Sequence, residues 1–201
     1  MIRVLLAEDQ AMVRGALASL LTLEGDIEVV AQVARGDEIL AAAHGASPDV
    51  ALLDIEMPGG DGLSAAASLA DHMPEVHVVM LTTFGRPGYL RRAMASGARG
   101  FVLKDAPASE LATAIRRVMA GERVLDPALA AAALADGESP LTPREAEVLA
   151  AARRGEPVVD LAGRLHLSAG TVRNYLSSAM QKLGAHSRAE AVRVAEDKGW
   201  L

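Results

Sequence analysis

Four short motifs in the first half of the chain carry side chains that could bind a divalent cation and accept a phosphoryl group. The acidic pair Glu8-Asp9, the carboxylate Asp54, the hydroxyl of Thr82 and the amine of Lys104 each end or follow an apolar run. Carboxylates held close together repel one another unless a cation neutralises them, and a hard ion such as Mg²⁺ prefers oxygen ligands. A carboxylate nucleophile, a hydroxyl donor and an amine around such an ion indicate phosphoryl transfer to Asp54.

These residues can meet only if the apolar runs before them form one sheet. The runs are mostly continuous rather than alternating, which is typical of strands buried on both faces, and strands are expected at Ile2–Ala7, Ile27–Val33, Val50–Asp54, Val76–Thr82 and Gly100–Leu103. Helical segments with one apolar stripe are expected between and after them, at 11–23, 36–44, 62–72, 87–96 and 108–120. The alternation predicts a doubly wound α/β fold, in which the carboxyl ends of parallel strands share a ligand-binding edge.

The composition indicates two domains without cysteine chemistry. The chain has 201 residues, 51% of them hydrophobic but only 2% aromatic, which fits two cores of ordinary size built from aliphatic side chains. The absence of cysteine excludes disulfides and thiolate chemistry. No apolar run approaches the ~18 residues of a membrane span, and Glu8-Asp9 interrupts the first run before a secretory signal could form. We therefore expect a cytoplasmic protein without a membrane partner.

A change of pattern near residue 126 marks the expected domain boundary. Asp126-Pro127 ends the strand–helix alternation, and the Ala-rich stretch Ala128–Pro140 indicates a short helix or tether followed by a loop. We expect a first domain at 1–122, a linker at 123–138 and a smaller domain at 139–201.

The second domain is expected to consist of helices at Pro143–Arg154, Pro157–Leu165, Ser168–Leu183 and Ser187–Lys198. Thr142 and Glu145 have the spacing of a capping box, with a proline at the first helical position. Gly155 and Gly184 stand where left-handed residues end helices. The second and third helices, joined by a tight turn at His166-Leu167, form a helix-turn-helix pattern.

Bulk charge does not support DNA binding by this domain. Residues 1–126 hold eleven Lys/Arg against seventeen Asp/Glu, and 127–201 hold nine of each. The helix expected at 168–183 nevertheless contains two basic residues and no acid, and at about 24 Å it is long enough to lie in a major groove. The side chains expected on its exposed face are Arg173, Asn174, Ser177, Ser178 and Gln181.

Residues 1–120 resemble the receiver domain of two-component response regulators through Glu8-Asp9, Asp54-Ile55-Glu56-Met57-Pro58, Asp61-Gly62, Thr82, Phe101 and Lys104. The resemblance implies a flavodoxin-like (βα)5 fold and phosphorylation of Asp54 by a histidine kinase. It implies that Mg²⁺ is held by Asp9, Asp54 and the backbone carbonyl of Glu56, with Glu8 helping through water. It also implies that Lys104 and Thr82 bind the phosphoryl group, and that the ring of Phe101 turns inward when Thr82 follows that group.

The C-terminal segment resembles the helix-turn-helix domain of the LuxR-type, or NarL/FixJ, response regulators through Leu141-Thr142-Pro143-Arg144-Glu145, Thr171-Val172-Arg173-Asn174-Tyr175 and Lys182-Leu183, among other motifs. The match implies that Arg173, Asn174 and Ser177 face bases and that Thr171 and Tyr175 reach phosphates. Lys182 is also expected among the DNA-binding residues.

Two further features concern the subgroup and the strength of DNA binding. The stretch Thr82–Tyr89 is similar to the DesR-like subgroup, which contains regulators of membrane-lipid desaturation. Where the family commonly has Ser/Thr-Asn-Lys-Glu, this chain has Pro157-Val158-Val159-Asp160, so a phosphate-contacting lysine is lost. We therefore expect weaker non-specific binding and a shallower salt dependence than is typical.

A domain with so few basic residues should bind DNA poorly alone, so we expect phosphorylation to promote a homodimer that reads two half-sites of a double-stranded operator about 10 bp apart. The stripe Leu111, Ile115 and Val118, with the first helix, is a candidate for the dimer face. RNA polymerase is a possible further partner.

Three other interpretations were weighed. A phosphohydrolase with an aspartyl nucleophile needs Asp-x-Asp-x-Thr after the first strand, where this chain has Glu8-Asp9-Gln10. A flavodoxin-like electron carrier needs a phosphate-binding loop there, and an acidic pair would repel the phosphate. A receiver that is never phosphorylated and serves as a scaffold is disfavoured by the intact set of acids, threonine and lysine.

Overall fold

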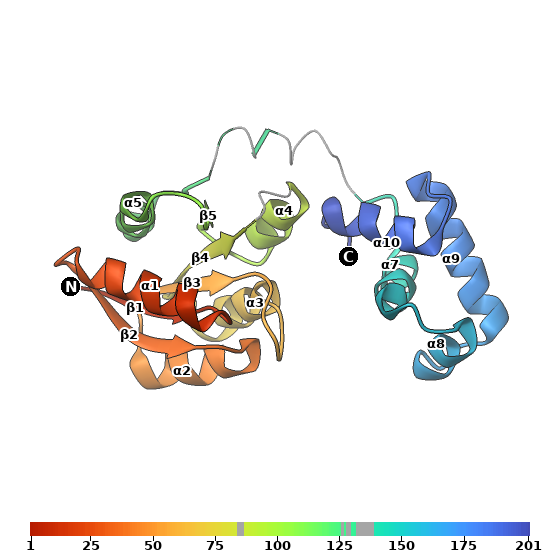
Figure 1. The fold of residues 1–201 in the computed structure, drawn as a ribbon, viewed down its shortest axis with the longest axis horizontal. Coiled ribbons are helices and arrows are strands. Elements are labelled where there is room, and N and C mark those ends of the chain that lie inside the picture. The colour runs from red at the N-terminus through yellow and green to blue at the C-terminus, as the bar shows by residue number, and fades with distance from the viewer. Residues whose placement is uncertain (84–86, 126, 128–129, 132–138) are drawn as a thin grey trace. The chain divides into compact units, whose positions relative to one another are not determined.

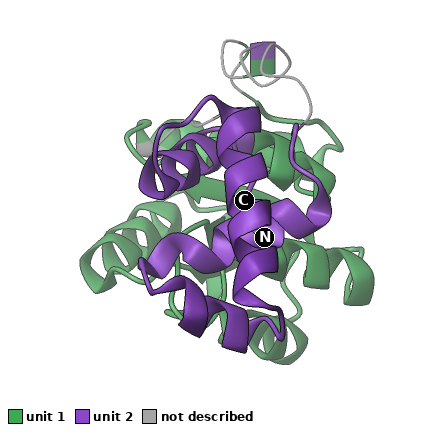
Figure 2. Ribbon diagram, turned by 90° about the vertical axis from the view of Figure 1, so that its right-hand side faces the viewer, with its two compact units in different colours: residues 1–85, 90–130 green, residues 86–89, 131–201 purple. Residues whose placement is uncertain are grey.

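The computed structural model describes residues 1–83, 87–125, 127, 130–131 and 139–201. The chain forms two compact units, one built mainly from residues 1–130 and the other mainly from 131–201, shown in green and purple in Figure 2. Much of the predicted linker and part of the DesR-like stretch lie outside the described residues. Across the part of the chain that is described, no helix is both long and apolar enough to cross a membrane.

The first unit contains the predicted five-stranded parallel sheet, in the order β2-β1-β3-β4-β5 (Figure 1). The strands are β1 (Ile2–Ala7), β2 (Ile27–Val33), β3 (Val50–Asp54), β4 (His77–Thr82) and β5 (Gly100–Leu103). This order confirms the doubly wound α/β fold.

One strand starts a residue later than expected, at His77 instead of Val76. The Val76 N–H donates to the Met73 carbonyl in the turn after α3 (Gly62–His72), at 3.0 Å, and the ladder begins with the His77 N–H donating to the Asp49 carbonyl at 2.9 Å. The turn uses the backbone group that a strand residue would have offered to the sheet.

Helices cover both faces of this sheet. On one face α1 (Ala11–Thr22) and α5 (Ala108–Met119) pack against each other and share a core with alternate strand residues. On the other, α2 (Ile39–Ala46), preceded by the 3₁₀ turn η1 (Gly36–Glu38), and α3 pack on β1 to β4. A further helix, α4 (Pro87–Ala95), lies between β4 and β5 along the chain.

The apolar stripe of α5 is part of the core. Leu111, Ile115 and Val118 are at most 4% exposed and pack with Ala18 and Leu21 of α1. The stripe itself was predicted correctly, but its suggested use as a dimer face is wrong, because side chains already buried in one chain cannot bury further surface against a second.

The sheet extends past β5 in a way that the sequence pattern does not reveal. After α5 the chain returns beside β5, where Val124 forms a parallel bridge with Gly100. The Phe101 N–H donates to the Val124 carbonyl and the Val124 N–H donates to the Arg99 carbonyl, both at 2.9 Å. A single bridging residue has no periodicity, so it could not be recognised as a strand. It satisfies part of the edge of β5 that would otherwise be unpaired.

The second unit is helical, as predicted. Its helices are α7 (Pro143–Ala151), the 3₁₀ turn η2 (Ala152–Arg154), α8 (Val158–Arg164), α9 (Ala169–Leu183) and α10 (Arg188–Asp197). The capping box of Thr142 and Glu145 is present, and Ser168 caps α9 by accepting from the Thr171 N–H at 3.0 Å. Gly155 and Gly184 are left-handed, with φ of 72° and 62°. These local signals determine where the helices of the second unit begin and end.

Candidate phosphoacceptor site and nucleic-acid interface

Strand register brings the predicted site residues to one edge of the sheet. Ala7 of β1 pairs with Leu53 of β3, so the residues that come next, Glu8 and Asp54, are neighbours. Because the strands are parallel, the carboxyl end of each lies at this edge.

The same register continues through the other two strands. Asp54 pairs with Leu81 of β4, so Thr82 follows at the same level. Thr82 in turn pairs with Leu103 of β5, and the Lys104 N–H donates to the Thr82 carbonyl at 2.8 Å. The four motifs singled out in the sequence therefore form one site.

The acidic residues form a compact cluster around the lysine. One carboxylate oxygen from each of Glu8, Asp9 and Asp54 lies within 4.8 Å of the others. Glu8 is fully buried, Asp54 is 5% exposed and Asp9 is exposed. Lys104 Nζ lies 2.6 Å from Glu8 Oε2 and 2.8 Å from Asp54 Oδ2. One ammonium thus pairs with two of the three carboxylates, which leaves the site with a surplus of negative charge.

The protonation equilibria reflect this surplus. Burial raises the pKa of Asp54 above its ordinary value of 3.8, with Glu8 adding to the rise, although Lys104 and the backbone N–H of Glu56 act in the opposite direction. Burial alone would lower the pKa of Lys104, but its bonds to Asp54 and Glu8 outweigh burial and raise it. Lys104 therefore stays charged, and the ionised form of Asp54 is less stable here than it is in a free aspartate.

The donor set fits a hard divalent cation. All three side chains offer carboxylate oxygens, which suit Mg²⁺, and the exposed Asp9 leaves one side of the cluster open to water, which Mg²⁺ tends to retain. A divalent ion would offset the negative charge that Lys104 leaves unbalanced.

Two supporting residues place Asp54, and the sequence did not indicate their roles. The Gly62 N–H donates to the Ile55 carbonyl at 3.0 Å, and a Cβ at Gly62 would overlap the carbonyl oxygen of Asp54, so only glycine fits there. Asp61 caps α3 by accepting from the Ser64 N–H at 2.7 Å. The Asp61-Gly62 motif was the available signal, but it does not reveal which backbone atom the glycine must clear.

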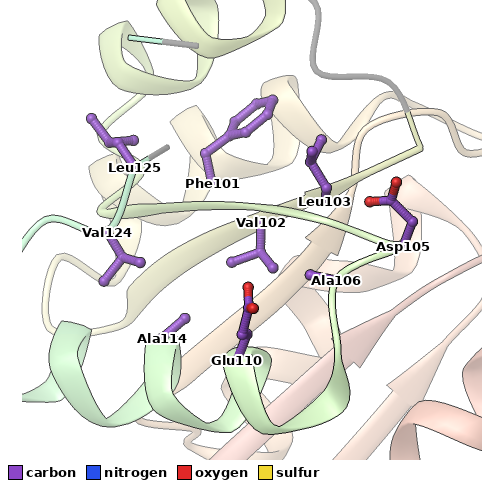
Figure 3. A pocket seen from close by; sticks show the side chains of 9 residues that line it. All are labelled: Phe101, Val102, Leu103, Asp105, Ala106, Glu110, Ala114, Val124 and Leu125. Atoms are coloured by element: carbon purple, nitrogen blue, oxygen red, sulfur yellow. The ribbon is translucent and has the colours of Figure 1, made fainter. Parts of the chain in front are cut away.

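The predicted switch residues share one face of the sheet. Thr82 is 4% and Phe101 is 3% exposed. Phe101 pairs with Met80, two residues before Thr82, and alternate strand residues point to the same face. Figure 3 shows Phe101 and Val102 projecting to opposite sides of β5, beside a cavity of about 370 Å³.

The helix-turn-helix places most of the predicted DNA-facing side chains outward. Arg173, Asn174 and Ser177 are exposed on α9, while Thr171 and Tyr175 are half-buried on its flank. Beneath them the helix is anchored by Val172 and Leu176, which are buried together with Leu161 of α8. Leu165 and Leu183 are partly buried against the same core.

Two side chains of α9 depart from the expected arrangement. Ser178, predicted to be exposed, is half-buried, and its hydroxyl donates to Glu145 Oε1 at 2.6 Å. Lys182 donates to Glu145 Oε2 at 2.7 Å. Arg173 makes no ion pair with any residue that the structure describes. At the start of α8, Val159 belongs to the motif that departs from the family pattern. Its side chain is apolar and 67% exposed.

Two known families match separate parts of the chain. A model described as the response regulator receiver domain matches residues 4–116. A second model, described as bacterial regulatory proteins of the luxR family, matches residues 139–195.

Similar proteins match over the whole chain. Uncharacterized transcriptional regulatory protein YvfU and transcriptional regulatory protein DesR, both from Bacillus subtilis (strain 168), are 48% and 44% identical over 201 residues, with all of both chains covered. Among solved structures, the response regulator ChrA of a heme-sensing two-component system is 35% identical with a TM-score of 0.58, over 100% of this chain and 98% of that one.

Proposed function

The chain belongs to the two-component response regulators of the LuxR (NarL/FixJ) family, and we propose that phosphorylation of Asp54 controls its binding to an operator. The family expected from the motifs, including the likeness to DesR, is thereby confirmed. A receiver domain implies a kinase as partner, and a luxR-type domain implies DNA binding. Members of this family regulate transcription, and we propose that this chain does so rather than acting as a phosphohydrolase or an electron carrier.

The proposal that Asp54 is phosphorylated is supported above all by the cluster of Glu8, Asp9 and Asp54, two of which pair with Lys104. In the proposed step an oxygen of Asp54 forms a bond to the phosphorus of a phosphohistidine, and the bond from phosphorus to the imidazole nitrogen of the kinase breaks. Lys104 leaves its carboxylate partners to offset charge on the phosphoryl oxygens, and Thr82 donates a hydroxyl to them.

Asp9 and Asp54, with the Glu56 carbonyl and with Glu8 through water, are the proposed Mg²⁺ ligands. The ion would supply positive charge between the anionic nucleophile and the phosphoryl group. Of these ligands, the carbonyl rests on family resemblance alone, whereas the three carboxylates are supported by their grouping in the structure.

The signal would then pass from the phosphoryl group to DNA. Thr82 and Phe101 are the proposed switch, since both are buried on one face of the sheet. Arg173, Asn174 and Ser177 are the proposed base contacts, and Thr171 and Tyr175 the proposed phosphate contacts. The scarcity of unpaired cations on α9 supports control through a homodimer that doubles the contact with DNA.

We also propose domain bounds, a cellular location and a further partner. We place the receiver at 1–122, the linker at 123–138 and the DNA-binding domain at 139–201, in a cytoplasmic protein whose further partner is RNA polymerase.

Intact-mass measurement tests the phosphorylation site. With acetyl phosphate and Mg²⁺ the wild-type chain should gain one phosphoryl group, and Asp54→Asn should gain none. Asp71→Asn, which alters an exposed aspartate on α3, is the matched control and should behave as wild type. An undiminished mass gain in Asp54→Asn would contradict the assignment. Gel mobility shift on genomic fragments, with and without the phosphodonor, then tests whether the modified form binds DNA more tightly.

A further inference from the structure

One carboxylate in the second unit joins two helices that are far apart in sequence. Glu145, on the first turn of α7, accepts hydrogen bonds from the Thr142 N–H at 2.7 Å, from the Ser178 hydroxyl at 2.6 Å and from Lys182 Nζ at 2.7 Å. Its side chain is 6% exposed, and that of Lys182 is 35% exposed. A capping residue would need only the first of these bonds. The other two tie the C-terminal half of α9 to the start of α7.

The charges of this pair depend on each other. Lys182 above all, followed by Ser178 and the Thr142 backbone, lowers the pKa of Glu145 from 4.5 to about 2. Glu145 is therefore an anion at any physiological pH. Lys182 is its one cationic partner among the described residues, and a buried anion that loses its counter-ion is strongly unfavourable.

Helix geometry separates Lys182 from Arg173, one of the proposed base contacts. Lys182 follows Arg173 by about two and a half turns, so the two side chains leave α9 on opposite sides of its axis. Thr171, Tyr175, Ser178 and Lys182 instead form one row along the flank of the helix, at spacings of three or four residues. The end of that row is occupied by Glu145.

We propose that Glu145 is a positioning residue for DNA recognition, and that Lys182 is its counter-ion rather than a contact to DNA phosphate. Glu145 holds the second half of α9 in place, so that Arg173, Asn174 and Ser177 are presented on a helix fixed at both ends, by the Ser168 cap and by this pair. The inference rests on the proposed function in that α9 must be the helix that binds DNA. It departs from the sequence-based expectation for Lys182.

The salt dependence of DNA binding distinguishes the two roles. Each cation that neutralises a phosphate contributes about 0.9 to the slope of log K against log salt concentration. The probe is a fluorescein-labelled, mixed-sequence duplex of about 30 bp, titrated by anisotropy with the full chain treated with acetyl phosphate. Lys182→Met should keep the wild-type slope while losing affinity by a similar factor at every salt concentration. Arg173→Met is the comparison variant, and as a proposed base contact it should lose less affinity on this mixed-sequence duplex than at an operator.

Two further variants show whether the pair acts through position. Lys182→Arg keeps a cation that can reach Glu145 and should restore most of the affinity lost in Lys182→Met. Glu145→Gln keeps groups that can bond to Ser178 and Thr142 but releases Lys182, so its slope should equal or exceed that of the wild type. A slope reduced by about 0.9 per bound chain in Lys182→Met, with Glu145→Gln unchanged in affinity, would overturn the inference.

A measurement without DNA keeps this inference separate from the proposed function. Carboxyl ¹³C NMR of the full chain at pH 4 should find Glu145 ionised in the wild type, and its pKa should be higher in Lys182→Met than in the wild type. A protonated Glu145 in the wild type at pH 4 would contradict the ion pair between Glu145 and Lys182, even if the chain binds DNA. Failure of the wild type to bind any duplex, with Glu145 ionised, would instead contradict α9 as the DNA-binding helix.

Discussion

Replacing the proposed phosphoacceptor by its neutral isostere, Asp54→Asn, should make the first unit more stable in buffer without divalent cations. Asp54 lies within 4.8 Å of Glu8 and Asp9 and is almost fully buried, while its single cationic partner Lys104 is shared with Glu8. An asparagine keeps the shape of the side chain, removes both repulsions and avoids the burial of a charge. The substitution loses the ion pair between Asp54 and Lys104, whereas the pair between Lys104 and Glu8 remains.

The expected size follows from the distances. At an effective dielectric constant of about 20, two like charges at 4.8 Å, the upper limit for the grouped carboxylate oxygens, repel by roughly 3.5 kcal/mol, and the pair at 2.8 Å attracts by roughly 6 kcal/mol. The two repulsions slightly exceed the one attraction, although water screens the exposed Asp9. Relief from burying the charge adds to the gain, so we expect the free energy of unfolding to rise by about 1 kcal/mol, or roughly 3–5 °C in the melting temperature.

The direction agrees with the pKa of Asp54. Because folding raises this pKa above 3.8, chiefly through burial, the group stabilises the fold when it is protonated. That contribution is complete below about pH 4 and is lost as the pH rises through the raised value. At neutral pH the ionised Asp54 is therefore a cost that asparagine removes.

Scanning calorimetry of the full chain measures the effect, with Trp200 fluorescence assigning the transition of the second unit, in whose core it packs. Asp71→Asn is the matched control and should not shift the first unit. Millimolar Mg²⁺ should raise the wild-type transition more than that of Asp54→Asn and so narrow the difference. A lower melting temperature for Asp54→Asn in chelator would refute the reasoning, because it would mean that the pair with Lys104 outweighs the repulsion.

Three further predictions test the metal, the DNA contact and the coupling. Asp9→Ala should lose Mg²⁺ binding and phosphorylation together, since the two remaining carboxylates are already paired with Lys104; wild-type Mg²⁺ affinity by calorimetry would mean that the ion binds elsewhere. Arg173→Ala should cost about 1–3 kcal/mol at the operator and less on random DNA, measured by anisotropy; equal losses would make Arg173 a phosphate contact. Phosphorylation should convert a mostly monomeric chain to a dimer by light scattering, a roughly hundredfold gain in association, or about 2.7 kcal/mol, with Lys104→Ala taking up phosphate but staying monomeric. Identical masses for the two wild-type forms at micromolar concentration would place control elsewhere.

Local pattern was enough to predict most of the elements. Four of the five strands begin and end at the residues expected from the sequence. The clearest case is β3, which is buried throughout and whose run Val50–Leu53 is continuously apolar. The helix ends at Thr142, Gly155 and Gly184 were also predictable, since each involves groups within a few residues of one another. The single late strand start, at His77, arose from a turn whose hydrogen bond has no sequence signature.

The membership of the phosphoacceptor site could likewise be predicted. Parallel strands carry their carboxyl ends to one edge, so Glu8, Asp54, Thr82 and Lys104 were expected at the same edge of the sheet. The register and the strand order made them neighbours. Sequence could not show that Lys104 bridges Glu8 and Asp54, or that Gly62 leaves room for the Asp54 carbonyl. Those facts depend on side-chain depth and backbone approach, which the residue types alone do not specify.

The second unit shows the same division most clearly. Sequence identified Glu145 as half of a capping box and Lys182 as a basic residue on the recognition helix, and each statement holds locally. Only the tertiary structure brought the two side chains together across 37 positions of the chain, with Ser178 beside them. Helical periodicity determines which residues share a face. Which other helix that face meets, and therefore whether a lysine is free for DNA or already neutralised, is decided by how the helices pack.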